Sequence, residues 1–129
     1  TAVDTINRMI SYFPQNERDL IRQEIAYSLQ GVVCQRLLKK IGGGRIPAVE
    51  ILLGGMPIVR DAILDGDLDK LHGIIENDSD MRSFDQYAVE LYQKGLVSKE
   101  EAISACANEE GFQRIISGIK SSEGRRLLK

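Results

Sequence analysis

The stretch Val33–Leu53, with the sequence VCQRLLKKIGGGRIPAVEILL, predicts a β-hairpin. It holds two runs of mixed apolar and polar residues, the second over Ile46–Leu53, and the glycines Gly42–Gly44 separate them. Glycine reaches the positive φ angles that tight turns between antiparallel strands require. Pro47 cannot donate a hydrogen bond to a neighbouring strand, so we expect it at an edge or at an unpaired position.

Two helices are expected before this hairpin. The first carries an apolar face at spacings of three and four and ends at Pro14; the face consists of Val3, Ile6, Ile10 and Phe13. Asn16 is a candidate N-cap of the second helix, with Glu17 and Asp19 in its first turn. The apolar face of that helix is expected to include Ile21, Ile25, Leu29 and Val32.

The residues after the hairpin are expected to be helical. Pro57 suits the first position of a short helix that extends to about Asp65, and Asp67 is a candidate cap for the next. Capping signals also open three later helices; they are Ser83 with Gln86, Ser98 with Glu101, and Asn108. Gly95 suits a helix C-terminus. The predicted fold class is therefore mainly α with one β-hairpin.

Composition is that of an ordinary globular domain. The 129 residues are 43% hydrophobic and 28% charged, with a net charge of −2. This balance argues against a broad nucleic-acid surface, which requires clustered Lys and Arg. The apolar runs are too short for a membrane span or a signal peptide. The absence of an initial Met indicates a cut from a longer parent. Two cysteines favour a reducing compartment, and hence the cytosol.

Candidate chemical groups are few and have structural explanations. A phosphate-binding loop would continue from Gly42–Gly44 with Lys and Ser or Thr, whereas Arg45 and a strand follow. His72 is the single histidine, which excludes a two-histidine metal site within this chain. Cys34 and Cys106 lie among apolar residues and are expected to behave as small hydrophobic side chains.

Several acidic residues also have a simpler interpretation than metal binding. Asp65, Asp67 and Asp69 alternate as in a calcium loop, but a glycine and a distal glutamate are not at the required positions. Helix capping explains them better. We therefore expect no catalytic residue, no cofactor-binding residue and no metal ligand in this chain.

Three segments together resemble the PilT/PilU group of type IV pilus retraction ATPases. They are TAVDTINRMISYFP at the start, SLQGVVCQRLLKKIGGGRIPAVEILLGGMPIVRDAI in the middle and SFDQYAVELYQKGLVSKEEAISACAN towards the end. The resemblance covers nearly the whole chain and is weakest after about Ala107. It identifies the chain as similar to the C-terminal part of such bacterial motors, which are secretion-family P-loop ATPases.

The resemblance implies a domain arrangement and an assembly. Residues 1–55 would end a RecA-like ATPase domain, 56–120 would form a C-terminal helical domain, and 121–129 a basic tail. The parent would be an ATP hydrolase binding ATP and Mg at sites upstream of Thr1, so this fragment alone would not be an enzyme. The parent would act as a hexameric ring in the cytoplasm, peripheral to the inner-membrane pilus machinery. It would neither insert into the membrane nor bind nucleic acid.

The resemblance also assigns a candidate motif. The family's retraction motif, AIRNLIRE, aligns with the sequence IVRDAILD at Ile58–Asp65. The candidate residues for coupling ATPase state to movement are Ile58, Val59, Arg60, Asp61 and Ile63, with Arg60 foremost. Asp61 replaces Asn, Leu64 replaces the second Arg and Asp65 replaces Glu.

Three alternatives remain open at this stage. The first is a non-enzymatic helical interaction or regulatory module, for which the composition is equally suitable. The second is a pilus-assembly ATPase, although those usually carry a four-cysteine zinc site that two cysteines cannot form. The third is a nucleic-acid binder built from helices and a hairpin, which the near-neutral charge disfavours.

Overall fold

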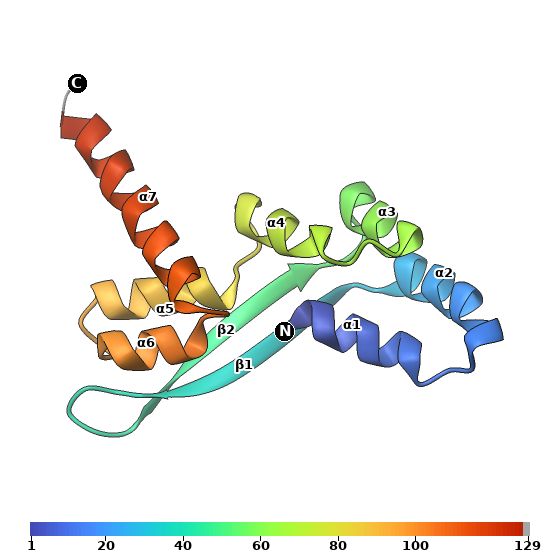
Figure 1. Ribbon diagram of the computed structural model, residues 1–129, viewed down its shortest axis with the longest axis horizontal. Helices are drawn as coiled ribbons and strands as arrows, with labels where there is room; N and C mark the ends of the chain where they lie inside the picture. The colour runs from blue at the N-terminus through green and yellow to red at the C-terminus, as the bar shows by residue number, and fades with distance from the viewer. Residues whose placement is uncertain (128–129) are drawn as a thin grey trace. The chain divides into compact units, whose positions relative to one another are not determined.

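A single β-hairpin forms the sheet of the described structure. The computed structural model describes residues 1–127, and side chains up to residue 118. Strands β1 (Gly31–Lys39) and β2 (Arg45–Leu53) pair as expected (Figure 1). All three loop glycines have positive φ, between 78° and 108°, and the Lys40 N–H donates to the Gly44 carbonyl at 3.0 Å. The predicted class, mainly α with a two-stranded antiparallel hairpin, is confirmed.

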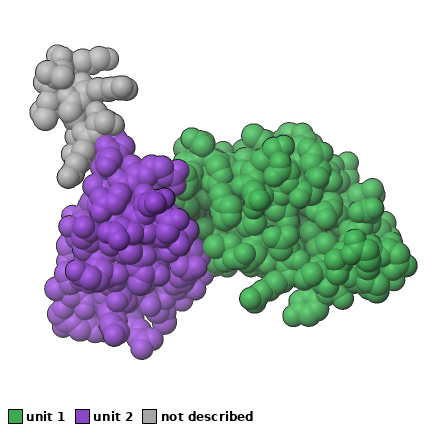
Figure 2. All heavy atoms as spheres, in the orientation of Figure 1, with its two compact units in different colours: residues 1–34, 49–83 green, residues 35–48, 84–129 purple. Residues whose placement is uncertain are grey.

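The chain forms two compact units (Figure 2). Each strand contributes residues to both units. The first unit consists of residues 1–34 and 49–83. It contains α1 (Ala2–Ser11), a 3₁₀ turn (Gln15–Glu17), α2 (Arg18–Ser28), α3 (Pro57–Asp65) and α4 (Lys70–Asn77). Its largest fully buried side chains are Ile6, Leu52, Val59, Ile63, Leu71 and Ile75. These apolar contacts are the main source of its stability.

The second unit consists of residues 35–48 and 84–129. It contains α5 (Phe84–Gln93), α6 (Lys99–Ala105) and α7 (Glu109–Leu127), which pack against one another. Phe112 is fully buried, and its ring lies 5.5 Å from that of Tyr92, measured between centroids. Two predicted termini are confirmed here. Gly95 has φ of 70° after α5, and the Ser98 hydroxyl accepts from the Glu101 N–H at 3.1 Å.

The second helix differs from its prediction at both ends. Asn16 does not cap it, because Gln15–Glu17 forms a 3₁₀ turn and α2 begins at Arg18. The helix ends at Ser28, and Leu29 has extended backbone with ψ of 124°. The apolar spacing that predicted a longer helix crosses this boundary, since Val32 lies in β1. A strand that pairs with β2 satisfies the backbone of this segment in place of helical hydrogen bonds.

Two smaller expectations also change. α4 begins at Lys70 rather than next to Asp67, which lies in the preceding turn and forms an ion pair with Lys70 at 3.1 Å. Phe13 lies beyond the end of α1 and is 39% exposed, so it does not belong to the buried face of that helix. These shifts affect the cap positions but leave the order of the elements as predicted.

The final segment is described only in part. The backbone of α7 is helical to Leu127 and so includes most of the expected basic tail, whereas residues 128–129 and the side chains from 119 onward lie outside the described residues. The domain boundaries expected at residues 55 and 120 stay predictions. Among the described helices, none has the length and apolar character needed to cross a membrane.

Candidate functional site

The predicted motif lies on α3, and particular residues explain where this helix begins and where it ends. Pro57 occupies its first turn, where its missing N–H costs no hydrogen bond. Gly66 ends it with φ of 73°, in the left-handed region that favours glycine. The helix packs against α2 and α4 through Val59, Ala62 and Ile63, which are at most 4% exposed. It is therefore a short, well-anchored element.

The five motif residues lie on different faces of this helix. Val59 and Ile63 point into the core of the first unit, whereas Ile58 is 56% exposed and Asp61 is also exposed. Arg60 lies at the margin between these two faces and is half-buried. The structure thus separates two anchoring residues from three that a partner can reach. Their role in coupling stays a prediction.

Arg60 has an unusual environment. Its guanidinium carbon lies 5.1 Å from the centroid of the Tyr27 ring on α2, within the range of cation–π attraction. Its Nε is buried and has no hydrogen-bond partner. A buried donor without an acceptor normally costs stability. The arginine is therefore held in place by ring contact rather than by hydrogen bonds at Nε.

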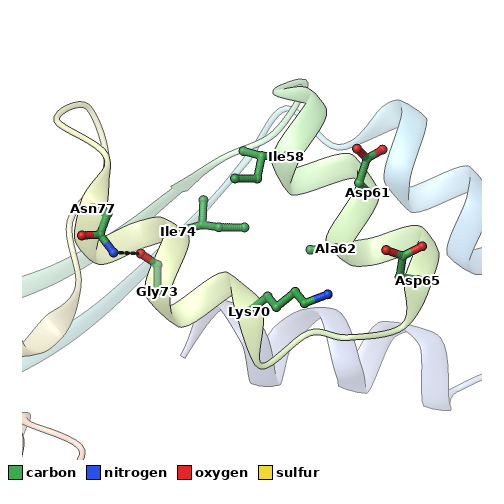
Figure 3. A pocket seen from close by; sticks show the side chains of 8 residues that line it. All are labelled: Ile58, Asp61, Ala62, Asp65, Lys70, Gly73, Ile74 and Asn77. Atoms are coloured by element: carbon green, nitrogen blue, oxygen red, sulfur yellow. Dashed lines mark hydrogen bonds between the residues drawn. The ribbon is translucent and has the colours of Figure 1, made fainter.

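A groove runs between α3 and α4, with a volume of about 460 Å³ (Figure 3). From α3 it is lined by Ile58, Asp61, Ala62 and Asp65, and from α4 by Lys70, Gly73, Ile74 and Asn77. The Asn77 side-chain amide donates to the Gly73 carbonyl at 2.7 Å, which fixes one end of the α4 wall. The lining combines an apolar floor with charged side chains at its rim.

No motif in the sequence indicates this groove directly. The sequence after Asp67 predicts only a helix, and the aspartates Asp65, Asp67 and Asp69 are expected only to cap helices. The one feature that could have indicated a binding surface is the number of acidic residues from Asp61 to Asp80. There are more of them than the helix caps in this segment require. Which of them border a common groove depends on the packing of α4 against α3.

The other candidate groups occupy structural positions. The glycine loop closes the hairpin, and Arg45 begins β2 where a phosphate-binding loop would continue into a helix, so its residues do not fit a phosphate cradle. His72 is exposed on α4. Among the described residues, no group of three or more His, Cys, Asp or Glu could hold a metal ion.

The two cysteines differ in environment. Cys106 is buried, and its burial, with a smaller contribution from Asp85, raises the pKa of the thiol to about 12. It therefore stays protonated at neutral pH and is a poor nucleophile. Cys34 is half-buried on β1, with its sulfur 3.9 Å from the Thr5 hydroxyl. Both are free thiols, and Cys106 has the character of a core residue, as expected.

Comparison with known proteins gives a consistent relationship. No family model matches the chain. The type IV pilus retraction ATPase PilT of Pseudomonas aeruginosa is 35% identical over 114 residues, covering 87% of this chain and 33% of PilT. A twitching motility protein of Neisseria gonorrhoeae is 31% identical, covering 86% of this chain and 30% of that protein. The chain thus spans about a third of the length of these relatives.

Solved structures agree with the sequence matches. A crystal structure of the pilus retraction motor PilT with bound ADP has a TM-score of 0.77 and 34% identity, covering 88% of this chain and 32% of that one. The ATPase DotB of Yersinia pseudotuberculosis has a TM-score of 0.68 at 20% identity, which shows a shared fold. The similarity extends over both compact units rather than over a single motif.

Proposed function

The chain is homologous to the C-terminal part of PilT/PilU-type ATPases, and we propose that it is that part of a motor which powers type IV pilus retraction and twitching motility. The observation that carries the proposal is the agreement of sequence and fold with PilT over most of the chain. ATP and Mg would be bound by other parts of the parent, since the glycine loop here does not fit a phosphate cradle. The parent would work as a hexameric ring in the cytoplasm at the inner-membrane pilus machinery.

Within this motor the chain would transmit movement rather than perform chemistry. Motors of this kind convert ligand binding and release into rigid-body shifts of packed elements. α3 suits such a role because its inner face is anchored by Val59 and Ile63 while Ile58 and Asp61 remain exposed. A load applied to the outer face would reach the core of the first unit through one short helix.

Arg60 is the residue we assign to contact another part of the ring. Its Nε has no partner within the described chain, and its guanidinium rests on the exposed ring of Tyr27. Arginine is well suited to bind a carboxylate or carbonyl group across an interface, because its planar head donates several hydrogen bonds at once.

The test is Arg60→Ala in the full-length parent, measured by twitching zones, by ATP hydrolysis and by the cellular level of the protein. We expect retraction to be lost while the protein level and basal hydrolysis are retained. Arg8→Ala is the matched control, because Arg8 is an exposed arginine on a different helix, α1. Normal twitching of Arg60→Ala, or an equal defect in Arg8→Ala, would refute the assignment.

A further inference from the structure

The groove between α3 and α4 has carboxylates at its rim that the fold does not use. Asp61 and Asp65 have no hydrogen bond or ion pair among the described residues, whereas Lys70 is already paired with Asp67. The floor between them is apolar and consists of Ile58, Ala62 and Ile74. Ile58 is more than half exposed, which leaves a large apolar side chain facing solvent at the groove.

The segment that forms both walls of the groove is more acidic than the chain as a whole. From Pro57 to Asn77 the sequence holds five acidic residues, one arginine and one lysine, a net charge of −3, within a chain whose total is −2. Such a concentration repels nucleic acid and attracts basic groups. A metal ion is not indicated, because the described residues contain no suitable cluster of ligands. The ligand chemistry that remains is cationic and apolar together.

We propose that this groove binds a basic, amphipathic segment of a partner protein. Asp61 and Asp65 lie one turn apart along α3, so they match two Lys or Arg side chains that are also one helical turn apart. Apolar side chains of the same segment would enter between α3 and α4, against Ile58 and Ile74. The inference does not depend on the motor role, since it concerns a surface of this chain alone.

Direct binding tests the proposal. The probe is a fluorescently labelled peptide of lysines and leucines whose leucines share one helical face, and its affinity for the full chain is measured by anisotropy. We expect the double substitution Asp61→Asn with Asp65→Asn to weaken binding about fivefold or more, since two exposed ion pairs are lost. Ile58→Ser should weaken it as well, because the leucine contact is lost. These three side chains are exposed, so the variants should fold normally.

The controls separate a specific groove from diffuse attraction. Asp19→Asn with Glu24→Gln removes the same charge from exposed positions of α2 that do not line the groove, and it should leave affinity nearly unchanged. A peptide with serine in place of leucine should bind more weakly than the probe. Equal effects of the two double substitutions, or equal binding of the serine peptide, would overturn the proposal.

Two further measurements identify where the probe binds and which molecule occupies the groove. Amide chemical shifts should change along α3 and α4 when the probe is added; changes confined to the second unit would overturn the assignment. The basic peptide 113–129 of this same chain serves as a competitor. If it displaces the probe at concentrations well below those of the unlabelled probe, the occupant is the C-terminal segment of this chain itself and the partner assignment fails.

Discussion

Each compact unit contains a buried carboxylate that accepts a hydrogen bond from a backbone N–H. The two units differ in the polar groups near their surfaces. In the first unit Glu50 accepts from the Ala2 N–H at 2.7 Å, at the beginning of α1. In the second, Asp85 accepts from the Ala107 N–H at 2.9 Å, just before α7. Glu50 is 3% exposed and Asp85 is 8% exposed. Glu50 complements an N–H group that a helix leaves unpaired at its start, and Asp85 satisfies a loop N–H between α6 and α7.

The second unit adds polar links between the hairpin and its helices. The Arg36 guanidinium donates to the Ala105 carbonyl at 2.7 Å and lies 4.3 Å from the Phe84 ring. The Glu101 carboxylate accepts from the Lys39 N–H at 2.7 Å. In the first unit, by contrast, Arg60 and Asp61 on α3 have polar atoms without partners among the described residues. We infer that the buried carboxylates stabilise the fold in both units, whereas the polar groups on the outer face of α3 are available for binding.

The largest effect is expected from Phe112→Ala in the second unit. The side chain is fully buried against Tyr92, so its loss should lower the free energy of unfolding by about 3–5 kcal/mol. Urea denaturation followed by circular dichroism measures this. Tyr12→Ala is the control, because Tyr12 is 85% exposed and its removal should have little effect. A loss below about 1 kcal/mol for Phe112→Ala would contradict the description of this core.

An intermediate effect is expected from each buried carboxylate. Asp85→Ala and Glu50→Ala should each lower the free energy of unfolding by about 1–3 kcal/mol, since a backbone N–H loses its acceptor. Asp61→Ala, on the exposed face of α3, should change it by less than about 0.5 kcal/mol. Chemical denaturation of the three variants gives the comparison. If Asp61→Ala were as costly as the other two, the proposed division between fold and binding would be wrong.

A smaller effect should depend on pH through Cys106. Its folded pKa of about 12 exceeds the ordinary value of 9.0, so the unfolded chain loses this proton first as pH rises. Stability is then unaffected below pH 9 and falls above it, by about 1 kcal/mol at pH 10. Cys106→Ala should lack this component. Unfolding of both proteins at pH 8 and pH 10 measures it, and an identical pH dependence in the two would contradict the prediction.

The smallest effect is expected from Arg60→Met, which keeps the apolar stem of the side chain. The variant loses a cation–π contact worth about 0.5–1 kcal/mol at an exposed site but also removes a buried Nε without a partner. The two terms oppose each other, so the free energy of unfolding should change by less than about 0.5 kcal/mol. A loss above about 1.5 kcal/mol would make Arg60 a structural residue and weaken its assignment to movement.

Features that depend on a few neighbouring residues could be predicted from the sequence. The glycine loop, the beginning of α3 at Pro57 and the end of α5 at Gly95 are all as expected. In each case one residue type has a backbone property that alternatives lack. The resemblance of the chain to pilus retraction ATPases, seen first in its segments, is confirmed by the relatives and by the PilT structure.

Features that depend on distant residues could not be predicted. Helical spacing continued to Val32, but pairing with β2 decides that Gly31–Lys39 is a strand. Glu101 was expected to complete a capping box, yet its carboxylate accepts from Lys39, 62 residues earlier. The groove, likewise, requires α4 to pack on α3. The sequence position of a charged residue does not reveal whether its partner is a neighbour or lies across the fold.

The shared hairpin has a consequence for the order of events during synthesis. The first unit contains residues on both sides of 35–48, so it cannot close until the ribosome has released the chain well beyond β2. The hydrogen bond from Ala2 to Glu50 requires a residue 48 positions later, and the one from Arg36 to Ala105 requires a residue 69 positions later. Contacts of such separation slow folding. A cut at residue 55 divides the first unit. If the chain were expressed as the two fragments 1–55 and 56–129, we expect that the first unit would fold in neither of them.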